Sequence, residues 1–528
     1  VANTQTQEIV KHTEVSTTSY DSVSKDVADE TVKSDNLNEK EKTIEKVNNK
    51  TKTNTNTITK SPTIQSSNVA VKTYDPTKAV YVSRYRHEIN YDWNNQRMKD
   101  TWQLPGNSYG AGTRSDPTDL YTAINLLQQD GVIILLADDT AETVYETRPN
   151  APWINFGGSY YPGKGIGQQN TLFTIMGEED KTIVWSGLRE NTNMFSLSEG
   201  FNATLMNIVF RNGNASGIDR TQAGAGPTAT HGGAIDNRGS LQVINCTFEN
   251  IEANENGGAI ANYNQAKTLI ENCTFRNITS TASEQFQSGS VYYGGAISLL
   301  KNQTYMTEVT VRNSNFTDIE AEYGGVFLND GGKFTVENVN IENSTATREG
   351  GTVINLNGQF TMSNVNMTNL TAKEYGGAVA NIAGTMTLDN VNISNVDVTY
   401  SDDTVSMYGG TIYNKGTLTI KNSDLNNLSA DYGAAFSNDG GVFHAENVEL
   451  TDVEAKHEGG AIINFNNGQM DIDTITITGV SSKLYGAAVA NHEGTIDIDD
   501  AHISDVSLEL DWDLMEDMDG NYYGGTIY

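Results

Sequence analysis

Hydrophobic and polar residues alternate along much of the chain in short runs, and each run is interrupted by Gly or Asn. One such run, Leu241-Gln-Val-Ile-Asn-Cys-Thr-Phe248, is matched by residues 269–275 in the next stretch of sequence. Side chains of a β-strand point alternately to its two faces, so the alternation predicts short strands with one buried face. The chain is therefore expected to be built mainly from β-structure.

Glycine doublets and close variants of them divide residues 201–528 into repeating units of roughly 25 residues. The doublets begin at Gly232, Gly257, Gly294, Gly324, Gly350, Gly376, Gly409, Gly433, Gly459, Gly486 and Gly524. A unit reads Gly-Gly-Ala-Ile-x-Asn, a Gly turn, alternating apolar residues, an Asn and two further apolar residues. Three short strands in a unit of this length are typical of one rung of a parallel β-helix. We predict an all-β fold, a right-handed parallel β-helix solenoid with three short strands per rung.

A larger period lies on top of this repeat. Tyr293-Gly-Gly recurs at Tyr408 and Tyr523, so that residues 294–408 and 409–523 form a duplicated super-repeat of four rungs. The chain stops five residues into a third copy, at Tyr528, and begins with Val1 rather than Met. We interpret the sequence as a fragment of a longer molecule from which a leader was removed or trimmed.

Two different parts precede the repeats. Residues 1–75 are rich in Thr, Ser, Asn, Lys and Glu and hold few apolar residues, which predicts a disordered linker. Residues 76–200 are predicted to form an N-terminal cap and the first irregular rungs, because a solenoid must cover the apolar end of its core. One short α-helix is expected there over 118–129, with Asp116 as its N-cap and Pro117 at its first position.

Alignment of the units places similar side chains in columns. An inward apolar column, stacked at about the 4.8 Å strand spacing, is predicted to form the core. It comprises Phe210, Phe248, Phe275, Phe316, Ile341, Met367, Ile393, Leu425, Leu450, Ile477 and Ile503. A structural ladder of turn asparagines, suited to the left-handed conformation and to amide bonds between rungs, is also expected. Its members are Asn207, Asn245, Asn272, Asn313, Asn338, Asn364, Asn390, Asn422 and Asn447. A second Asn column follows the doublets, from Asn237 to Asn491.

A column of tyrosines stands directly before many of the doublets: Tyr293, Tyr323, Tyr375, Tyr408, Tyr432, Tyr485 and Tyr523. One interpretation is an aromatic ladder that stiffens an edge, and the other is a binding platform for sugars or a partner surface. Insertions at 279–291, 397–407 and 505–521 fall at the same edge. The last insertion is acidic and is the one place where a Ca²⁺ ion is considered, although it lacks a ligand-spaced loop.

The composition limits the classes of partner that the chain is expected to bind. The 34 Lys and Arg residues against 67 Asp and Glu give a net charge of −33, which disfavours nucleic acid and anionic lipid. No apolar run is long enough for membrane insertion. Cys246 and Cys273 share a small buried position one rung apart, so they are expected to be fillers, and whether they are bonded stays open. We predict no metal ligand and no cofactor.

Sequons are frequent, and those expected to face outward, Asn343, Asn366 and Asn392, are possible glycosylation sites on an exported protein. Parallel β-helices also host polysaccharide lyases and hydrolases, so a glycan-cleaving enzyme is the alternative function. We predict no catalytic residue, because the chain has no Arg after Arg348 and its seven His do not recur in register with a Ser or Asp. A structural envelope or fibre subunit is a third possibility.

The recurring Gly-Gly-Ala-Ile, followed by Asn-Cys-Thr-Phe and Asn-Val-Asn-Ile, resembles the adhesin-like surface proteins of methanogenic archaea. It is more loosely similar to bacterial polymorphic outer-membrane proteins. The resemblance covers about residues 76–528 and implies an extracellular, cell-surface β-helix that attaches to other cells, through their surface glycans or proteins, with self-association as a further option. It supplies no catalytic residues.

Overall fold

The computed structural model describes residues 5–8, 13–16, 74–89, 91–92, 97–98, 110–128, 130–146, 154–156, 172–187, 193–215, 231–254, 256–280, 294–300, 306–398, 409–484, 486–508 and 526–527. Val1–Thr17 and Lys72–Tyr528 belong to one compact unit, while Thr18–Val71 forms the other and lies outside the described residues. All of the following concerns the first unit.

From residue 74 onward, the described elements begin with a region of short strands and helices. It contains the 3₁₀-helix η1 (Pro76–Lys78), β3 (Ala79–Val82), α1 (Arg84–Ile89), β4 (Tyr91–Asp92), β5 (Arg97–Met98) and α2 (Leu120–Leu126). The first rungs are formed by β6 (Val132–Leu135), β7 (Thr143–Glu146), β8 (Ile154–Phe156), β9 (Leu172–Gly177), β10 (Ile183–Ser186), β11 (Phe195–Leu197), β12 (Asn202–Met206), β13 (Val209–Arg211) and β14 (Asn214–Ala215).

Rungs of three separate strands follow. They are β15 (Ile235–Asn237), β16 (Ser240–Ile244) and β17 (Thr247–Ala253); β18 (Ile260–Asn262), β19 (Lys267–Glu271) and β20 (Thr274–Ser280); and β21 (Ile297–Leu299), β22 (Glu308–Arg312) and β23 (Asn315–Tyr323). The later rungs combine long strands, formed where neighbouring strands join, with short strands of three or four residues. These are β24 (Phe327–Glu349), β25 (Val353–Ala372), β26 (Val379–Asn381), β27 (Thr385–Val398), β28 (Ile412–Asn414), β29 (Thr417–Ala430), β30 (Phe436–Asp439), β31 (Val442–Ala455), β32 (Ile462–Phe465), β33 (Gly468–Ser482), β34 (Val489–Asn491) and β35 (Gly494–Leu508).

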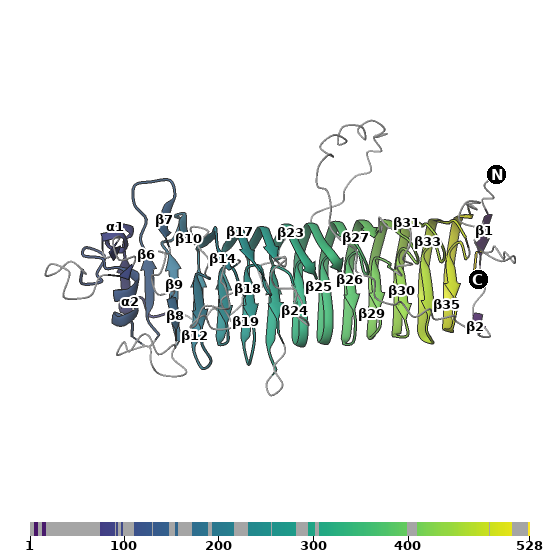
Figure 1. The fold of residues 1–528 in the computed structure, drawn as a ribbon, viewed down its shortest axis with the longest axis horizontal. Helices are drawn as coiled ribbons and strands as arrows, with labels where there is room; N and C mark the ends of the chain where they lie inside the picture. The colour runs from purple at the N-terminus through teal and green to yellow at the C-terminus, as the bar shows by residue number, and fades with distance from the viewer. Residues whose placement is uncertain are drawn as a thin grey trace, which may run out of the picture. The chain divides into compact units, whose positions relative to one another are not determined.

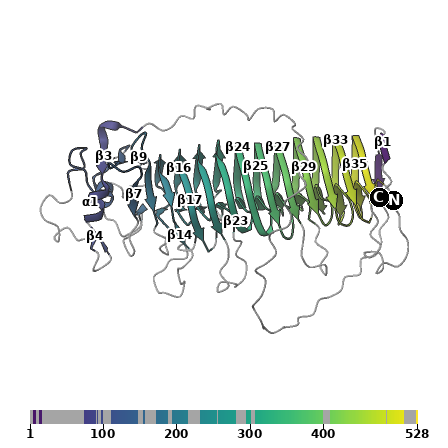
Figure 2. The ribbon, with the colours of Figure 1, turned by 90° about the horizontal axis from the view of Figure 1, so that it is seen from above.

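Strands of one rung pair in parallel with the equivalent strands of the next rung, so the predicted parallel β-helix is confirmed. β15 pairs with β18 and β18 with β21, while β16 pairs with β19 and β17 with β20. The same pairing continues through β29, β31, β33 and β35. Figure 1 shows these rungs side by side along the solenoid, and Figure 2 shows their strands in parallel rows from a second direction.

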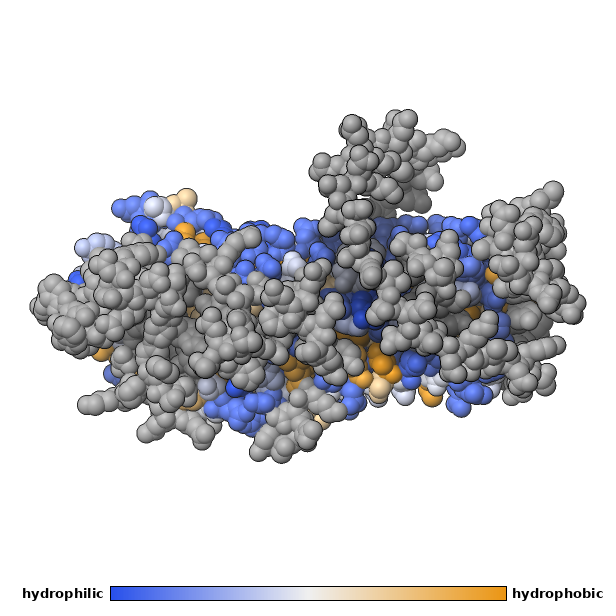
Figure 3. Space-filling model, in the orientation of Figure 1, coloured by the Kyte–Doolittle hydropathy of each residue, from blue (hydrophilic) through white to orange (hydrophobic). Residues whose placement is uncertain are grey.

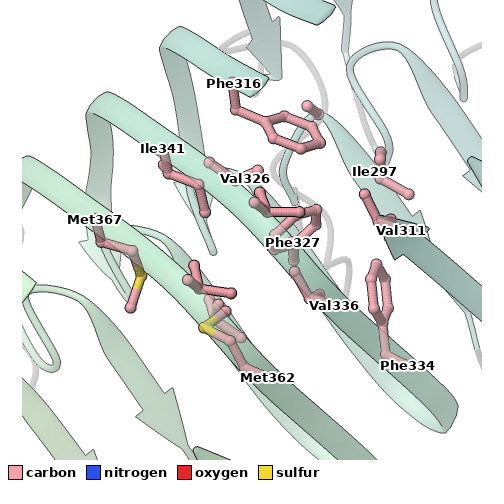
Figure 4. Packing of buried hydrophobic residues seen from close by; sticks show 14 of the residues in the cluster. Ile297, Val311, Phe316, Val326, Phe327, Phe334, Val336, Ile341, Met362 and Met367 are labelled. Atoms are coloured by element: carbon pink, nitrogen blue, oxygen red, sulfur yellow. The ribbon is translucent and has the colours of Figure 1, made fainter. Parts of the chain in front are cut away.

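The predicted inward column forms the core, and every member of it is buried. Its phenylalanines stack, with ring centroids 4.6 Å apart between Phe248 and Phe275 and between Phe275 and Phe316. Figure 4 shows the continuation of this column through Ile341 and Met367 on successive rungs. Alternate residues of the strands thus bury one continuous apolar interior, which supplies the main driving force for folding.

The long strands bend at asparagines in the left-handed region. The nine asparagines expected in the turn ladder, Asn207 to Asn447, all have φ between 49° and 55°. Amide bonds join several neighbours, such as Asn390 Nδ2 donating to Asn364 Oδ1 at 2.6 Å. A second bend in each rung carries another run of left-handed residues, which includes Asn343 and Asn369. The second expected column, from Asn237 to Asn491, is almost fully buried and also forms an amide ladder.

The cap differs from its expected form in two ways. It contains two short α-helices, α1 and α2, whereas only one helix was predicted. Helix α2 is also shorter than predicted, and its N-cap is Asp119, whose Oδ1 accepts from the backbone N–H of Thr122 at 2.9 Å. Asp116 does not cap the helix, because its carboxylate accepts from Ala111 N–H at 2.9 Å and pairs with Arg86 at 3.1 Å.

Two strands lie within the segment predicted to be a disordered linker. β1 (Gln5–Glu8) and β2 (Thr13–Ser16) pair antiparallel with β35, whose outer edge offers unpaired backbone groups. Residues 17–73 lie outside the described residues, and the linker and domain boundaries stay predictions. Among the described helices, none is both long and apolar enough to span a bilayer.

Candidate functional site

Each rung contains a short strand of three or four residues; in some rungs this segment is the start of a long strand. The second residue of the segment points away from the core. The first residue of each belongs to the main core, as Ile260 and Val353 do. The second residues form two separate apolar clusters outside it, one with Leu328, Ile354 and Ala380 and the other with Tyr413, Ile463 and Ala490. Phe465, which follows a buried Asn, joins the second cluster. We call this outward side the short-strand face. These clustered side chains are themselves buried, and partly exposed residues such as Tyr375, Tyr432 and Ile382 pack on them. Those partly exposed residues make this side the leading candidate site.

Two flanking columns border these outward residues. The column before the doublets contributes the half-buried tyrosines Tyr323, Tyr375 and Tyr432, and the register of Tyr323 with Glu349 places that carboxylate in the same column. The column after the buried Asn contributes Leu300, Leu356 and Ile382, which pack on the first apolar cluster. Hydrophobic atoms also reach the surface over the middle rungs in Figure 3. The face is therefore apolar in its centre and bordered by aromatic and acidic groups.

Aromatic rings on this face occur in stacked pairs. Tyr375 and Tyr413 lie 4.7 Å apart between ring centroids at an interplanar angle of 23°. Tyr432 and His457 lie 4.6 Å apart at 21°. Tyr413 is only 4% exposed, so the half-buried Tyr375 and Tyr432 supply the accessible aromatic surface on this side.

A charged group adjoins Tyr323. The Arg348 guanidinium lies over the Tyr323 ring, 5.2 Å from its centroid, and binds both oxygens of Glu374 at 2.9 and 3.3 Å. Burial raises the pKa of Tyr323 to about 12. Burial also raises the pKa of Glu349, and the nearby Glu374 carboxylate raises it further. The pKa of Glu322 is raised for the same two reasons, although Arg348 opposes the shift. Carboxyl groups with raised pKa values are able to hold a proton closer to neutral pH.

A second polar group adjoins Tyr413. Its hydroxyl donates to Asp439 Oδ2 at 2.5 Å, and Lys415 Nζ lies 2.9 Å from the same oxygen. Asn466 Nδ2 donates to the other oxygen of Asp439 at 2.6 Å. Burial alone would raise the pKa of Asp439, but these three donors outweigh it and lower the pKa. The Asp439 carboxylate is therefore held ionised among donors.

A shallow groove of about 370 Å³ runs beside the face, along the turns that follow the buried asparagines. Its lining residues are Met306, Gly331, Gly332, Asn357, Gly358, Gln359, Ala383, Gly384, Thr385, Gly416 and Thr417. Glycine is required in these turns, because a Cβ on Gly384 would lie 2.2 Å from Asn355 Nδ2. The Met306 side chain is 58% exposed at this groove. Glycine backbone, polar side chains and the apolar side chains of Met306 and Ala383 thus line a surface that adjoins Leu356 and Ile382 in the sequence.

The N-terminal part of the face is polar. Asp236, whose side chain is buried in β15, accepts a short hydrogen bond from the Tyr263 hydroxyl. Ser196 Oγ lies 3.5 Å from the other carboxylate oxygen, and Arg238 Nη2 lies 3.7 Å from it. The Arg238 guanidinium also lies 5.0 Å from the centre of the Tyr263 ring, and the His231 ring lies 5.9 Å from it. The buried Asp236 carboxylate is thus paired with a partly exposed Arg238 beside aromatic rings.

Among the described residues, one group could hold a metal ion, and it lies on a different side of the rungs. Donor atoms of His444, Glu446 and Asp473 lie within 4.8 Å of one another. Protein partners already occupy this group, since Glu446 pairs with Lys421 and His444 Nδ1 lies 3.2 Å from Asp471. The acidic insertion considered for Ca²⁺ lies mostly outside the described residues.

The structure describes only some of the predicted site residues. Tyr323, Tyr375 and Tyr432 lie in one column of the short-strand face, whereas Tyr293, Tyr408, Tyr485 and Tyr523 lie outside the described residues. Asn343 and Asn392 are exposed, and Asn366 is partly exposed. Both cysteines are free and buried, and burial raises the pKa of Cys246 to about 12.

Several residues of the face are missing from the sequence-based prediction, namely Asp236, Tyr263, Glu349, Tyr413 and Glu458. A signal was present for two of them, because Glu349 and Glu458 stand directly before glycine doublets as the tyrosines do. Asp236 and Tyr413 occupy single outward positions of short strands, which become visible only when the rungs are aligned by strand register.

Comparison with solved structures finds distant likenesses. A solved structure of the catalytic domain of a GH87 alpha-1,3-glucanase in complex with nigerose is 13% identical to the chain, with a TM-score of 0.34. The match covers 72% of this chain and 64% of that one, so the chain spans less than two thirds of that domain. Two single-residue variants of this domain, also with nigerose, give TM-scores of 0.35 and 0.33.

The parallel pairing of its own rungs places the chain in the class of long parallel β-helices. No family model and no curated protein matches the chain. The resemblance to adhesin-like surface proteins of methanogens accordingly stays a prediction.

Proposed function

We propose that the chain is an adhesin-like, cell-surface β-helix protein that binds glycans of other cells through its short-strand face. The observation that carries the proposal is the second apolar layer outside the core, with Tyr375 and Tyr413 stacked on it. One face of a pyranose ring carries mainly C–H groups and packs well on an aromatic ring. Repetition of this layer on successive rungs suits a polymer of sugars better than one small molecule.

Polar groups at the edges of the apolar layer support this proposal. Sugar hydroxyls need hydrogen-bond partners when they leave water, and binding sites supply them as a few placed polar groups. Asp439 and Lys415 lie next to the stacked Tyr413, and Arg348 lies over Tyr323. These groups offer such donors and acceptors. The adjoining glycine groove adds room for a chain that extends along the rungs.

An extracellular location is part of the proposal. Asn343, Asn366 and Asn392 are the proposed glycosylation sites. Each of the three donates one amide N–H to a ladder neighbour, at 2.8 to 3.0 Å, and an asparagine amide has two such hydrogens. A glycan on the second hydrogen position is thus compatible with the ladder bond. The net charge of −33 keeps copies of the chain apart in solution.

A glycan array with the full chain tests the proposal. Tyr375→Ala and Tyr432→Ala each remove an aromatic ring from the face, and the pair is expected to lower binding by at least about tenfold. Tyr85→Ala is the matched control, since Tyr85 is 67% exposed in the cap and lies away from this face. Equal binding by the double variant and the control would refute the assignment of the face. An array without any positive glycan would favour a structural envelope or fibre subunit, and self-association would then be measured.

A second candidate function, glycan cleavage, is favoured by one observation. The raised pKa of Glu349, caused by burial and by Glu374, is the property that a general acid of a glycosidase requires. Release of reducing ends from polysaccharides that bind the protein would identify this activity. Glu349→Gln should then abolish release, while Glu458→Gln, which changes a carboxylate in the same column of another rung, should not. Binding without release would leave adhesion as the function.

A further inference from the structure

Two adjacent rungs bring a histidine and three carboxylates together on the outward side of their long strands, away from the short-strand face. His444 and Glu446 are two residues apart in β31, so their side chains project from the same face of the strand. Asp471 and Asp473 have the same spacing in β33, and the register places Asp471 directly beside His444. Burial alternates along both strands at these positions, so all four side chains point outward.

Three of these side chains have donor atoms close enough to share one ion. Donor atoms of His444, Glu446 and Asp473 lie within 4.8 Å of one another, and His444 Nε2 lies 3.8 Å from Asp473 Oδ2. Two ligands of a tetrahedral Zn²⁺ ion lie about 3.4 Å apart when each bond is about 2.0–2.1 Å long. The three side chains are 28%, 45% and 45% exposed, so small rotations close the difference. An ion from solvent therefore reaches all three without crossing the protein.

The orientation of the imidazole ring separates this group from a patch of acidic side chains. His444 Nδ1 lies 3.2 Å from Asp471 Oδ2. Donation of the Nδ1 proton to this carboxylate leaves the lone pair on Nε2, which is the nitrogen near Asp473. Histidines that bind metal ions almost always donate their other ring N–H in this way. Asp471 is thus a positioning residue that prepares His444 to bind a cation.

Lys421 is the group that such an ion has to displace. It is in register with Glu446 on the preceding rung and pairs with that carboxylate. Both side chains are more than a third exposed, and exposed pairs of this kind contribute little to stability. Asp389, in register with Lys421 on the rung before, attracts the same ammonium group. Lys421 therefore keeps a carboxylate partner when Glu446 turns to an ion.

We infer that His444, Glu446 and Asp473 bind one divalent transition-metal ion, of which Zn²⁺ is the type, and that the ion links two adjacent rungs. An imidazole ligand suits Zn²⁺ better than Ca²⁺ or Mg²⁺, which take oxygen ligands. Three protein ligands leave one position for water or an external ligand. The inference goes beyond the proposed glycan binding and does not depend on it, because the two sites share no residue.

Calorimetry of the untagged full chain with zinc chloride tests the inference, and we expect one equivalent of Zn²⁺ to bind. His444→Gln and Glu446→Gln should each weaken this binding by at least about tenfold, since even the loss of a positioning residue has an effect of this size. His502→Gln is the control for the histidine, because His502 is exposed on β35 and is in register with Thr476. Glu449→Gln is the control for the carboxylate, because Glu449 is exposed on the same strand as Glu446. Both controls should bind Zn²⁺ as the parent chain does.

Lys421→Gln provides a variant with the opposite expected effect. It removes the competing ammonium group, so it should strengthen Zn²⁺ binding, by up to about fivefold. Weaker binding by this variant would overturn the inference. So would the absence of binding at zinc concentrations up to about 1 mM, or equal affinities of His444→Gln and His502→Gln. Displacement of Zn²⁺ by an equal concentration of Ca²⁺ or Mg²⁺ would also overturn it, because the carboxylates alone would then account for the binding.

Discussion

The buried amide ladder offers the sharpest test of how the rungs are held together. Asn381 is fully buried, and its Nδ2 donates to Asn414 Oδ1 at 2.8 Å. Its own Oδ1 accepts from Asn355 Nδ2, also at 2.8 Å. Asn381→Ala therefore leaves one donor and one acceptor of the neighbouring rungs unpaired in a dry interior. At about 1–3 kcal/mol for each unpaired group, we expect a loss of about 3 kcal/mol in the free energy of unfolding.

The exposed Asn340 provides the control, because it occupies an amide ladder with the same connectivity. Its Nδ2 donates to Asn315 Oδ1 at 3.1 Å, and its Oδ1 accepts from Asn366 Nδ2 at 3.0 Å. Water replaces these bonds when Asn340 is changed to Ala, so the expected loss is below about 1 kcal/mol.

Urea unfolding followed by circular dichroism measures both variants. Hydrogen exchange then shows whether the destabilisation is local to the rungs around residue 381, as expected for a solenoid with nearest-neighbour stability. Equal effects of the buried and the exposed substitution would refute the reasoning that burial makes this ladder important.

Three further predictions concern the core, a partly exposed His–Glu pair and the thiols. Phe275→Ala interrupts the phenylalanine stack and should cost about 3–5 kcal/mol in unfolding free energy, whereas a loss below about 1 kcal/mol would contradict the packing. The hydrogen bond to Glu458 raises the pKa of His492 above its ordinary value of 6.5. The stabilisation that the protonated His492 gains from this pair is therefore complete below pH 6.5. It is lost as the pH rises through the folded-state pKa of His492. Thermal unfolding of His492→Gln should lack this decline toward alkaline pH, and an unchanged pH profile would exclude the pair as its cause. Cys246 and Cys273 should resist a thiol reagent at pH 8 until urea is added, because burial raises both thiol pKa values; prompt labelling of the native protein would contradict this.

The sequence was sufficient to predict the inward columns and the bends of the solenoid. Phe275 and Ile393 recur at a fixed place in each unit, and a repeated apolar residue can be buried only if the units stack in register. Asn390 and Asn422 occur where the alternation of apolar residues breaks, and Asn is among the few residues that tolerate the left-handed conformation. Each of these predictions depends on a local rule that every rung repeats. The structure therefore shows the same burial and the same bends from rung to rung.

The short-strand face could not be predicted in the same way. A short strand such as β26 or β28 turns a single second residue outward, so the period of two gives no signal for it within one rung. Leu328 and Ile354 form a cluster only because register places them on adjoining rungs. The N-cap of α2 was missed for a related reason, since Asp116 is held by Arg86, which is distant in sequence.

Hydrogen exchange of the full chain, with and without a glycan that the array identifies, tests the central claim most directly. We predict slower exchange on binding in the peptides that carry the short-strand face, over 373–384 and 409–416. The outward side of the neighbouring strands, over 417–421 and 442–446, should remain unchanged. Protection confined to those neighbouring strands, or protection that persists in the Tyr375→Ala/Tyr432→Ala variant, would contradict the proposal that this face binds glycans.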